Sequence, residues 1–268
     1  MIFLSWVKNR QVTIAQYIDE IIDLSNAEKS KTLENGKQKE TLSFTQKLRL
    51  TFKYPLIQWT TVRLSYLYIA VNIVFYGLIL SAGGLPGSDL FNNAMMAILT
   101  VPSAFTIAIS AKPKVGRTKF IMVMFTLTAV SCLGSEYLLL KAGDLDSCEN
   151  SETETADLYR NIGRTMAFIG KFFVSAVFSC LMLYSSEVYS TDVRAELYGF
   201  CNFMGKIGST IAPYILVIKQ IISWGPGVLF GLLSLSSALI ALSMPETIGS
   251  PMLMNMDEAT KYYKKGKK

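Results

Sequence analysis

Residues 64–82 read LSYLYIAVNIVFYGLILSA, an uncharged run in which apolar side chains follow one another without alternation. About 20 apolar residues let a helix cross the ~30 Å hydrocarbon core of a bilayer, at about 1.5 Å per residue. The strands of a membrane barrel would instead alternate apolar and polar residues. The run therefore predicts a transmembrane helix.

Five more runs of the same kind follow this one along the chain. They are residues 89–110, 120–140, 162–184, 197–218 and 227–243. The composition agrees, since 51% of the 268 residues are hydrophobic and only 17% are charged, whereas soluble domains average about 25% charged residues. We expect an all-α integral membrane protein with six transmembrane helices.

The charges between the runs predict the orientation. Loop 111–119 carries four basic residues and no acid, loop 141–161 is rich in acids, and the tail 244–268 ends in lysines. Basic residues near span ends favour the cytoplasm. We therefore expect a cytoplasmic segment 1–63, a six-helix bundle 64–243 and a cytoplasmic basic tail 244–268. The net charge of +6 fits this topology rather than a nucleic-acid surface.

The residue inventory argues against an enzyme. The chain has no histidine, and its four cysteines show no C-x-x-C spacing. Histidine-based zinc sites and Ser-His-Asp or Cys-His catalysis are thereby excluded. We expect no catalytic residue, no metal and no cofactor.

Charged side chains inside the spans mark the candidate site, because burying a charge in a membrane costs at least ~2.5 kcal/mol. Glu136 and Arg164 lie near the predicted outer surface, where long side chains can reach water. Lys171 lies in the middle of its span and either contacts substrate or locks two helices. Lys206 lies nearest the bilayer centre, on a polar stripe with Asn202, so it either lines an anion-binding cavity or is structural. The remaining positions of this helix form an apolar stripe of Leu197, Phe200, Met204, Ile207 and Ile211, so the helix has one polar and one apolar stripe.

Deep aromatic residues suit an amphipathic, ring-bearing ligand. Phe75 and Tyr76 lie in the first span and Phe178 in the fourth. Such rings also commonly just pack.

Several motifs occur in one order along the chain. Residues 170–178 read GKFFVSAVF, residues 183–194 read LYSSEVYSTDVR, and Pro245-Glu246-Thr247 follows the last span. The same ordered pattern includes Phe75-Tyr76-Gly77-Leu78, Gly116-Arg117 and Gly205-Lys206-Ile207-Gly208. This pattern resembles the organic cation/anion/zwitterion transporter family of the major facilitator superfamily, specifically its C-terminal half.

The resemblance implies a function and a set of site residues. It implies alternating-access transport of small organic ions by two six-helix halves around a central site. Substrate-binding residues would be Lys206, Phe75, Tyr76, Phe178, Asn202 and Lys171. Arg117, Glu187 and Arg194 would form a cytoplasmic charge network that closes and opens the inner side.

The charge at position 206 favours organic anions. In the family this position is arginine in anion carriers and aspartate in cation carriers, and lysine keeps the positive sign. Ala104 lies near the place of a second cation that anion carriers commonly have.

Alternatives stay open. One alternative is an organic cation or zwitterion carrier. The other is a truncated, non-transporting membrane protein that associates with or regulates a full-length transporter. We expect a multi-pass protein of the plasma membrane, with the lipid bilayer, an organic ion and either an N-terminal half or a second copy as partners.

Overall fold

The computed structural model describes residues 55–110, 116–146, 153–191, 193–218 and 225–247. These residues belong to the compact unit Leu48–Lys268, and they form helices without any β-strand. Segment 1–54, which holds most of the predicted cytoplasmic segment, lies outside the described residues. Most of the predicted basic tail lies outside them too.

Four helices are long and apolar enough to cross a membrane. They are α3 (Pro55–Ser81), α7 (Arg117–Asp146), α8 (Thr153–Val188) and α10 (Gly225–Leu242). Together with α9 (Arg194–Ile218) and a broken helix after α3, they give the six predicted spans. The predicted all-α membrane fold is confirmed, and the chain is a multi-pass membrane protein.

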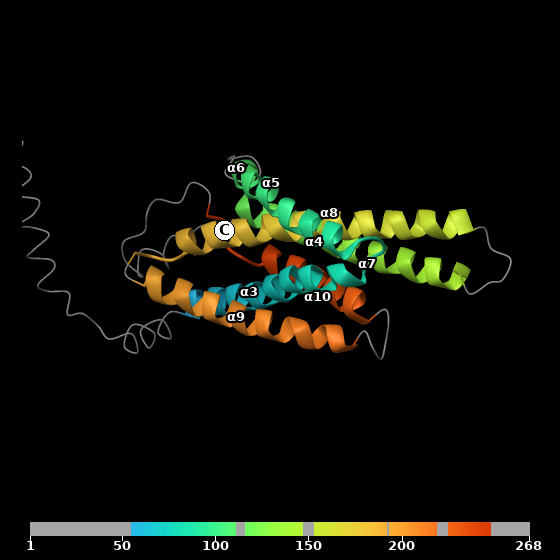
Figure 1. The fold of residues 1–268 in the computed structure, drawn as a ribbon. Helices are drawn as coiled ribbons and strands as arrows, with labels where there is room; N and C mark the ends of the chain where they lie inside the picture. The colour runs from blue at the N-terminus through green and yellow to red at the C-terminus, as the bar shows by residue number, and fades with distance from the viewer. Residues whose placement is uncertain (1–54, 111–115, 147–152, 192, 219–224, 248–268) are drawn as a thin grey trace, which may run out of the picture. The chain divides into compact units, whose positions relative to one another are not determined.

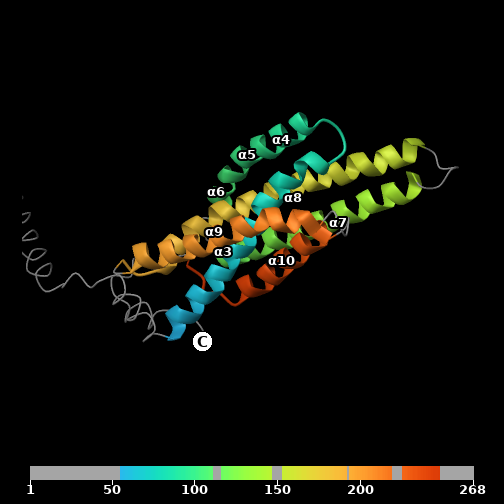
Figure 2. The ribbon, with the colours of Figure 1, turned by 60° about the horizontal axis from the view of Figure 1, so that its bottom comes forward.

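The helices pack as two pairs joined by α10. Helix α7 runs along α8, α9 runs along α3, and α10 contacts both α7 and α3 (Figures 1 and 2). Helix α3 also touches α8, so its apolar side chains form much of the core, including Leu64, Leu67 and Val71, which are fully buried. The core therefore follows from the run that opens the sequence.

Small residues let α9 approach α3 closely. A Cβ atom at Gly208 would lie 2.5 Å from the backbone oxygen of Ile69, and one at Gly205 would lie 2.6 Å from the Asn72 amide nitrogen. Membrane helices associate through small residues because apolar lipid provides no hydrophobic drive between them. The α3–α9 contact depends on these two glycines.

The packed face of α9 does not coincide with the apolar stripe of its sequence. Ile207 and Ile211 of the predicted apolar stripe are 41% and 40% exposed. The buried side instead carries Leu197, Cys201, Gly205, Gly208, Ala212 and Ile215. Large apolar residues of a membrane helix can face lipid, while small ones pack against other helices.

The second predicted span, 89–110, is not one straight helix. It forms α4 (Asp89–Ile98), α5 (Thr100–Phe105) and α6 (Ile107–Ser110), which contact α8 (Figure 2). Pro102 has no N–H to donate to the carbonyl four residues earlier, which interrupts the helical ladder. Thr106 then donates its N–H to Ser103 at 3.1 Å, a shorter-range bond that bends the chain again.

Two predicted boundaries shift. The described part of helix α3 already starts at Pro55, before the predicted start of the span at residue 64. Much of the predicted loop 141–161 is helical, since α7 continues to Asp146 and α8 starts at Thr153. The 36 residues of α8 span about 54 Å, well beyond a ~30 Å hydrocarbon core.

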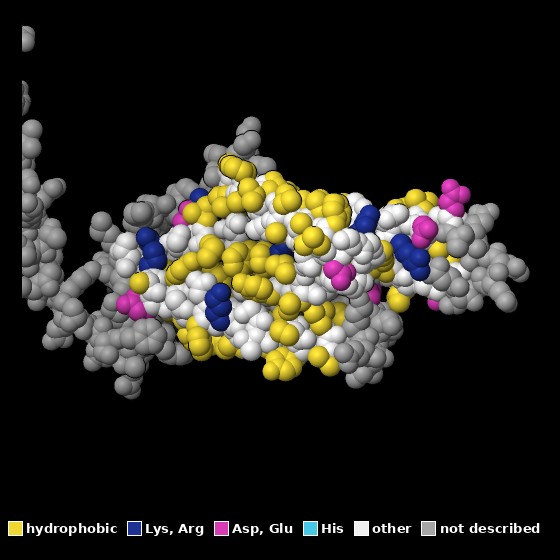
Figure 3. All heavy atoms as spheres, viewed as in Figure 1, with side chains coloured by type: hydrophobic (Ala, Val, Ile, Leu, Met, Phe, Trp, Pro, Cys, Tyr) yellow, Lys and Arg dark blue, Asp and Glu magenta, His cyan; other side chains and the backbone are white. Residues whose placement is uncertain are grey.

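The surface matches a membrane protein. On the face in Figure 3, apolar side chains spread over the middle of the helices, and most charged ones lie toward the two ends. Large apolar side chains are exposed on several helices, among them Leu90, Phe105 and Leu239 at 81%, 75% and 64%. Such exposure suits lipid rather than water.

Candidate functional site

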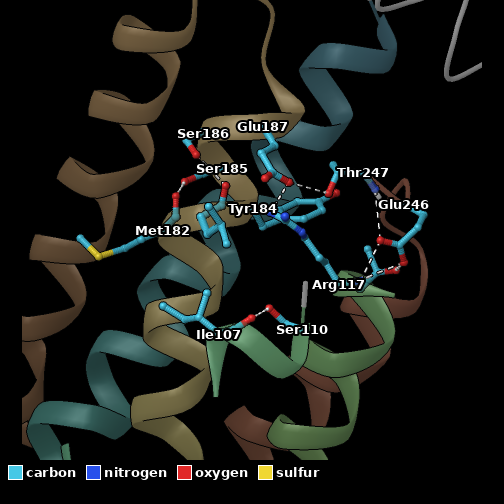
Figure 4. Close-up of polar contacts among 12 residues, drawn as sticks. Ile107, Ser110, Arg117, Met182, Tyr184, Ser185, Ser186, Glu187, Glu246 and Thr247 are labelled. Atoms are coloured by element: carbon cyan, nitrogen blue, oxygen red, sulfur yellow. Dashed lines mark hydrogen bonds and ion pairs between the residues drawn. The ribbon is translucent and has the colours of Figure 1, made fainter. Parts of the chain in front are cut away.

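A cluster of charged and polar side chains joins three helix ends at the predicted cytoplasmic side. Arg117 begins α7, Glu187 lies at the end of α8, and the two side chains form an ion pair (Figure 4). Thr247, which follows α10, donates its hydroxyl to Glu187 at 3.2 Å. The side chains of Arg117 and Glu187 are only 13% and 30% exposed, so water screens the pair less than at an open surface.

Glu246 caps the start of α7 from a distant part of the chain. Its carboxylate accepts the backbone N–H of Arg117 at 2.8 Å and of Thr118 at 3.3 Å, and the Thr118 hydroxyl at 2.5 Å. These N–H groups have no partner inside the helix, and the helix N-terminus carries partial positive charge. A carboxylate there accepts hydrogen bonds from these N–H groups and also interacts favourably with the positive end of the helix. It ties the segment after α10 to the start of α7.

Gly116 makes room for this cap. Its φ of +75° lies in the left-handed region that favours glycine, and a Cβ there would come within 2.7 Å of the Glu246 carboxylate. The Gly116-Arg117 and Pro245-Glu246-Thr247 motifs thus meet in space. The sequence showed both motifs, but the role of Glu246 and Thr247 was missed because nothing local pairs residues so far apart.

Arg194 does not join the ion pair directly. It begins α9, and its Nε donates to the carbonyl of Tyr189 at 3.3 Å. The Tyr189 hydroxyl in turn donates to Thr61 of α3 at 3.1 Å. Burial raises the pKa of Tyr189 well above its ordinary value, so this hydroxyl stays protonated as a donor. Arg194 therefore holds the α8–α9 turn, one step removed from Arg117 and Glu187.

A second cluster combines a lysine with aromatic rings. Lys171 of α8 is fully buried, and its ammonium lies 3.0 Å from the centroid of the Phe75 ring. Phe75 stacks on Phe178 at 5.3 Å between centroids, and Tyr76 meets Phe75 edge-on at 5.3 Å. Four of the six predicted substrate-binding residues thus lie together.

Lys171 has no hydrogen-bond partner in this cluster. Its Nζ is buried without an acceptor among the described residues. The face of the Phe75 ring offers Nζ a cation–π contact, which supplies part of the electrostatic stabilisation that a carboxylate would give.

Lys206 and Asn202 lie elsewhere, on α9. They are four residues apart and so share a face, on which Lys206 is exposed and Asn202 half-buried. The hydroxyls of Ser209 and Thr210 donate to the backbone carbonyl of Lys206 at 2.8 and 3.0 Å. No acidic side chain of the described residues pairs with Lys206. Its positive charge therefore lies on an exposed face of α9 beside polar side chains.

Metal binding has no support in this part of the chain. Within the described ranges, no three His, Cys, Asp or Glu side chains gather closely enough to hold a metal ion.

Comparison with known proteins identifies relatives along most of the chain. No protein-family model matches it. It is 29% identical over 208 residues to a "Solute carrier family 22 member 15-like" protein of Xenopus tropicalis, covering 77% of this chain and 39% of that protein. It is 23% identical over 248 residues to "Organic cation transporter 1" of Caenorhabditis elegans, covering 92% of this chain and 38% of that protein.

A third relative carries another member name of the same group. It is "Solute carrier family 22 member 6" of Pseudopleuronectes americanus, 24% identical over 202 residues, which cover 75% of this chain and 33% of that protein. The chain therefore spans less than two fifths of the length of these curated relatives.

Proposed function

We propose that this chain moves small organic ions across a membrane, because it is a relative of the organic cation and anion transporters of solute carrier family 22 in the major facilitator superfamily. That relationship confirms the resemblance seen in the motifs. Relatives named as transporters also support the expectation that the protein is not an enzyme. The proposed mechanism is alternating access by a complete transporter that contains these six helices.

We assign organic anions as the preferred substrates. The observation that carries this assignment is Lys206, an exposed ammonium on α9 without an acidic partner among the described residues. Once a partner half covers this face, the charge would stand in a low-dielectric cavity, where it attracts an anion far more strongly than in water. Asn202, one turn away, would donate hydrogen bonds to the same ligand.

The Lys171 cluster would act as a second contact for the ligand. Phe75 and Phe178 present ring faces to a ring-bearing substrate, and Tyr76 lies against Phe75. Displacing Phe75 from the ammonium of Lys171 would expose a second positive charge. A substrate with an aromatic ring and a carboxylate could use both features.

The cytoplasmic cluster would serve as the gate. Arg117, Glu187 and Glu246 join the ends of α7, α8 and α10, and Arg194 fixes the start of α9. Rocking of the helices must part these contacts, so their free energy sets the balance between inward-open and outward-open states. The proposal extends the predicted network by one residue, Glu246.

The setting is the plasma membrane, with both termini in the cytoplasm. The excess of lysine and arginine in loop 111–119 and in the tail supports this orientation of the termini. The partner is a six-helix half or a second copy, because the proposed central site lies between two such bundles.

Radiotracer uptake by the complete transporter tests the anion assignment. Lys206→Ala should raise the apparent Michaelis constant for an organic anion such as para-aminohippurate at least tenfold, which corresponds to about 1.4 kcal/mol. Lys206→Arg should be milder because the charge survives with altered geometry. Lys206→Asp should abolish anion uptake. Unchanged anion uptake in the alanine and aspartate variants, at equal surface expression, would refute the assignment.

A cation carrier is the second candidate, favoured by the name of the Caenorhabditis elegans relative. Aromatic faces such as Phe75 and Phe178 also attract cations. Tetraethylammonium uptake in the same variants separates the two. For a cation carrier, Lys206→Ala should leave uptake unchanged or increase it, since a repulsive charge is removed.

A further inference from the structure

The seam between α3 and α8 carries a seven-residue repeat on each helix. On α3 the repeat is Thr61, Tyr68 and Phe75, and on α8 it is Lys171, Phe178 and Ser185. Residues seven apart lie on the same side of a helix, since two turns take about 7.2 residues. Both repeats lie at the contact between the two helices, because Tyr68 meets Ser185 and Phe75 meets Phe178.

Two tyrosines cross this seam in opposite directions at its predicted cytoplasmic end. The Tyr68 hydroxyl of α3 lies 2.9 Å from that of Ser185 on α8, and Ser185 gives its own proton to the Met182 carbonyl at 3.0 Å, so Tyr68 is the donor. Tyr189, which follows α8, donates to Thr61 of α3 at 3.1 Å. All four paired side chains are buried. Because a buried hydroxyl without a partner costs about 1–3 kcal/mol, the two bonds favour one register of α3 against α8.

Further along the same seam lies the Lys171 cluster. Phe75 is seven residues after Tyr68, and Phe178 is seven residues before Ser185. The two rings stack at 5.3 Å between centroids, and Phe75 covers the Lys171 ammonium at 3.0 Å. A slide or rotation of one helix against the other would move the Phe75 ring off the ammonium. The register that the tyrosine bonds favour is therefore the one in which the ring covers the charge.

The other end of the seam meets the cytoplasmic cluster. Arg194 donates its Nε to the Tyr189 carbonyl at 3.3 Å. Glu187, which pairs with Arg117, lies two residues before Tyr189. The place of the Tyr189 hydroxyl thus depends on the same contacts that form the proposed gate.

We propose that Tyr68 and Tyr189 are positioning residues that couple the cytoplasmic gate to the Lys171 cluster. While the gate is closed, their hydroxyls hold α3 and α8 in the register in which Phe75 covers the ammonium. Parting of the gate contacts frees Tyr189, so the register relaxes and the ring uncovers Lys171. Coupling between two sites is reciprocal, so an anion that displaces Phe75 also favours an open gate. This inference rests on the function proposed above and names the side chains that link its two sites.

Acetylation of Lys171 measures how often Phe75 uncovers it. Acetic anhydride is small and uncharged, and it forms an amide with the neutral amine and releases acetic acid. The test uses the full chain in lipid nanodiscs, and the rate at Lys171 is divided by the rate at the exposed Lys141 in the same sample. Tyr68→Phe and Tyr189→Phe keep the rings and should each raise this ratio about threefold, which corresponds to the ~0.6 kcal/mol of an average hydrogen bond between membrane helices.

The matched control is Tyr66→Phe. Tyr66 lies on the same helix, and its hydroxyl pairs with that of Ser236 on α10 at 2.7 Å, away from the seam. This variant loses a hydrogen bond of the same kind and should leave the ratio unchanged. Ser185→Ala should raise the ratio less than Tyr68→Phe does, because Tyr68 can still donate to the Leu181 carbonyl at 3.4 Å. Equal ratios in the three phenylalanine variants would overturn the proposal.

Uptake kinetics of the complete transporter separate positioning from general stability. When the ring covers the ammonium less firmly, it competes less with the anion, so Tyr68→Phe should lower the apparent Michaelis constant for para-aminohippurate about threefold without raising the maximal rate. A lower surface level with an unchanged Michaelis constant would mean a structural role alone and would overturn the coupling. If the complete transporter takes up no anion in any variant, the proposed function fails, and the acetylation ratios still decide whether the tyrosines position Phe75.

Discussion

Removing the carboxylate that caps α7 should open the cytoplasmic side. Glu246 accepts two backbone N–H groups and one hydroxyl at the start of α7, all between 2.5 and 3.3 Å. Losing a helix cap costs about 0.5–2 kcal/mol, and losing a negative charge at a helix N-terminus costs a further ~0.3–1 kcal/mol. Glu246→Ala should therefore destabilise the closed arrangement by roughly 2 kcal/mol, about a 30-fold change in population.

The assay is alkylation of Cys180 in a complete transporter in which the other cysteines are serine. Cys180 is fully buried on α8, two turns before Glu187. When opening is fast relative to labelling, its labelling rate from the cytoplasmic side follows the open population. Glu246→Ala should raise this rate about 30-fold, and Glu246→Gln, which keeps an acceptor oxygen, should raise it less. A rate that stays within twofold of the starting protein, with thermal stability unchanged, would refute the capping argument.

Three further perturbations test the gate, the packing and the topology. Arg117→Glu and Glu187→Arg should each impair uptake by the complete transporter at normal surface level, and the double swap should restore part of that uptake. Equal loss of uptake in all three variants would exclude the ion pair as a gate element. Arg194→Ala should also impair uptake, because it loosens the α8–α9 turn. Gly208→Leu should lower the free energy of unfolding by about 1–3 kcal/mol, because a Cβ atom at position 208 meets the backbone of Ile69. Gly199→Leu on the same helix is the control and should be neutral, since a Cβ atom there meets no atom within 4 Å. Similar melting temperatures for the two variants would argue against close α3–α9 packing. Cys148, in the acidic loop, should react with an impermeant thiol reagent in intact cells, and labelling only after permeabilisation would reverse the orientation.

The fold was predictable because its signal is local. Each span is a continuous apolar run, and the bilayer thickness fixes how long such a run must be. Helix ends were less predictable: residues such as Asp157 and Arg160 read as a polar loop, yet they extend α8 and pair at 3.3 Å. Hydropathy measures where a helix leaves the membrane, and a helix can continue into water.

The site was predictable only in part. Polarity within a span pointed to Lys171 and Lys206, and the structure places one under an aromatic ring and the other on an exposed surface. Nothing local distinguishes these two settings, because each depends on what the neighbouring helices present. Glu246 was missed as a cap for the same reason, since its partners lie far away along the chain.

The two faces of α9 link the packing to the proposed function. Gly205 and Gly208 fasten one face to α3, and that close contact fixes the rotation of the helix about its axis. The rotation in turn decides which residues are left uncovered, and Lys206, between the two glycines in sequence, lies on the opposite, exposed side. A polar stripe alone could not tell whether Lys206 faced α3 or a partner bundle. The small residues decide it, because a lysine cannot occupy a contact that barely admits a hydrogen atom in place of a side chain. Among the described residues the charge of Lys206 therefore has no acidic partner, and the partner half or substrate that we propose would meet it.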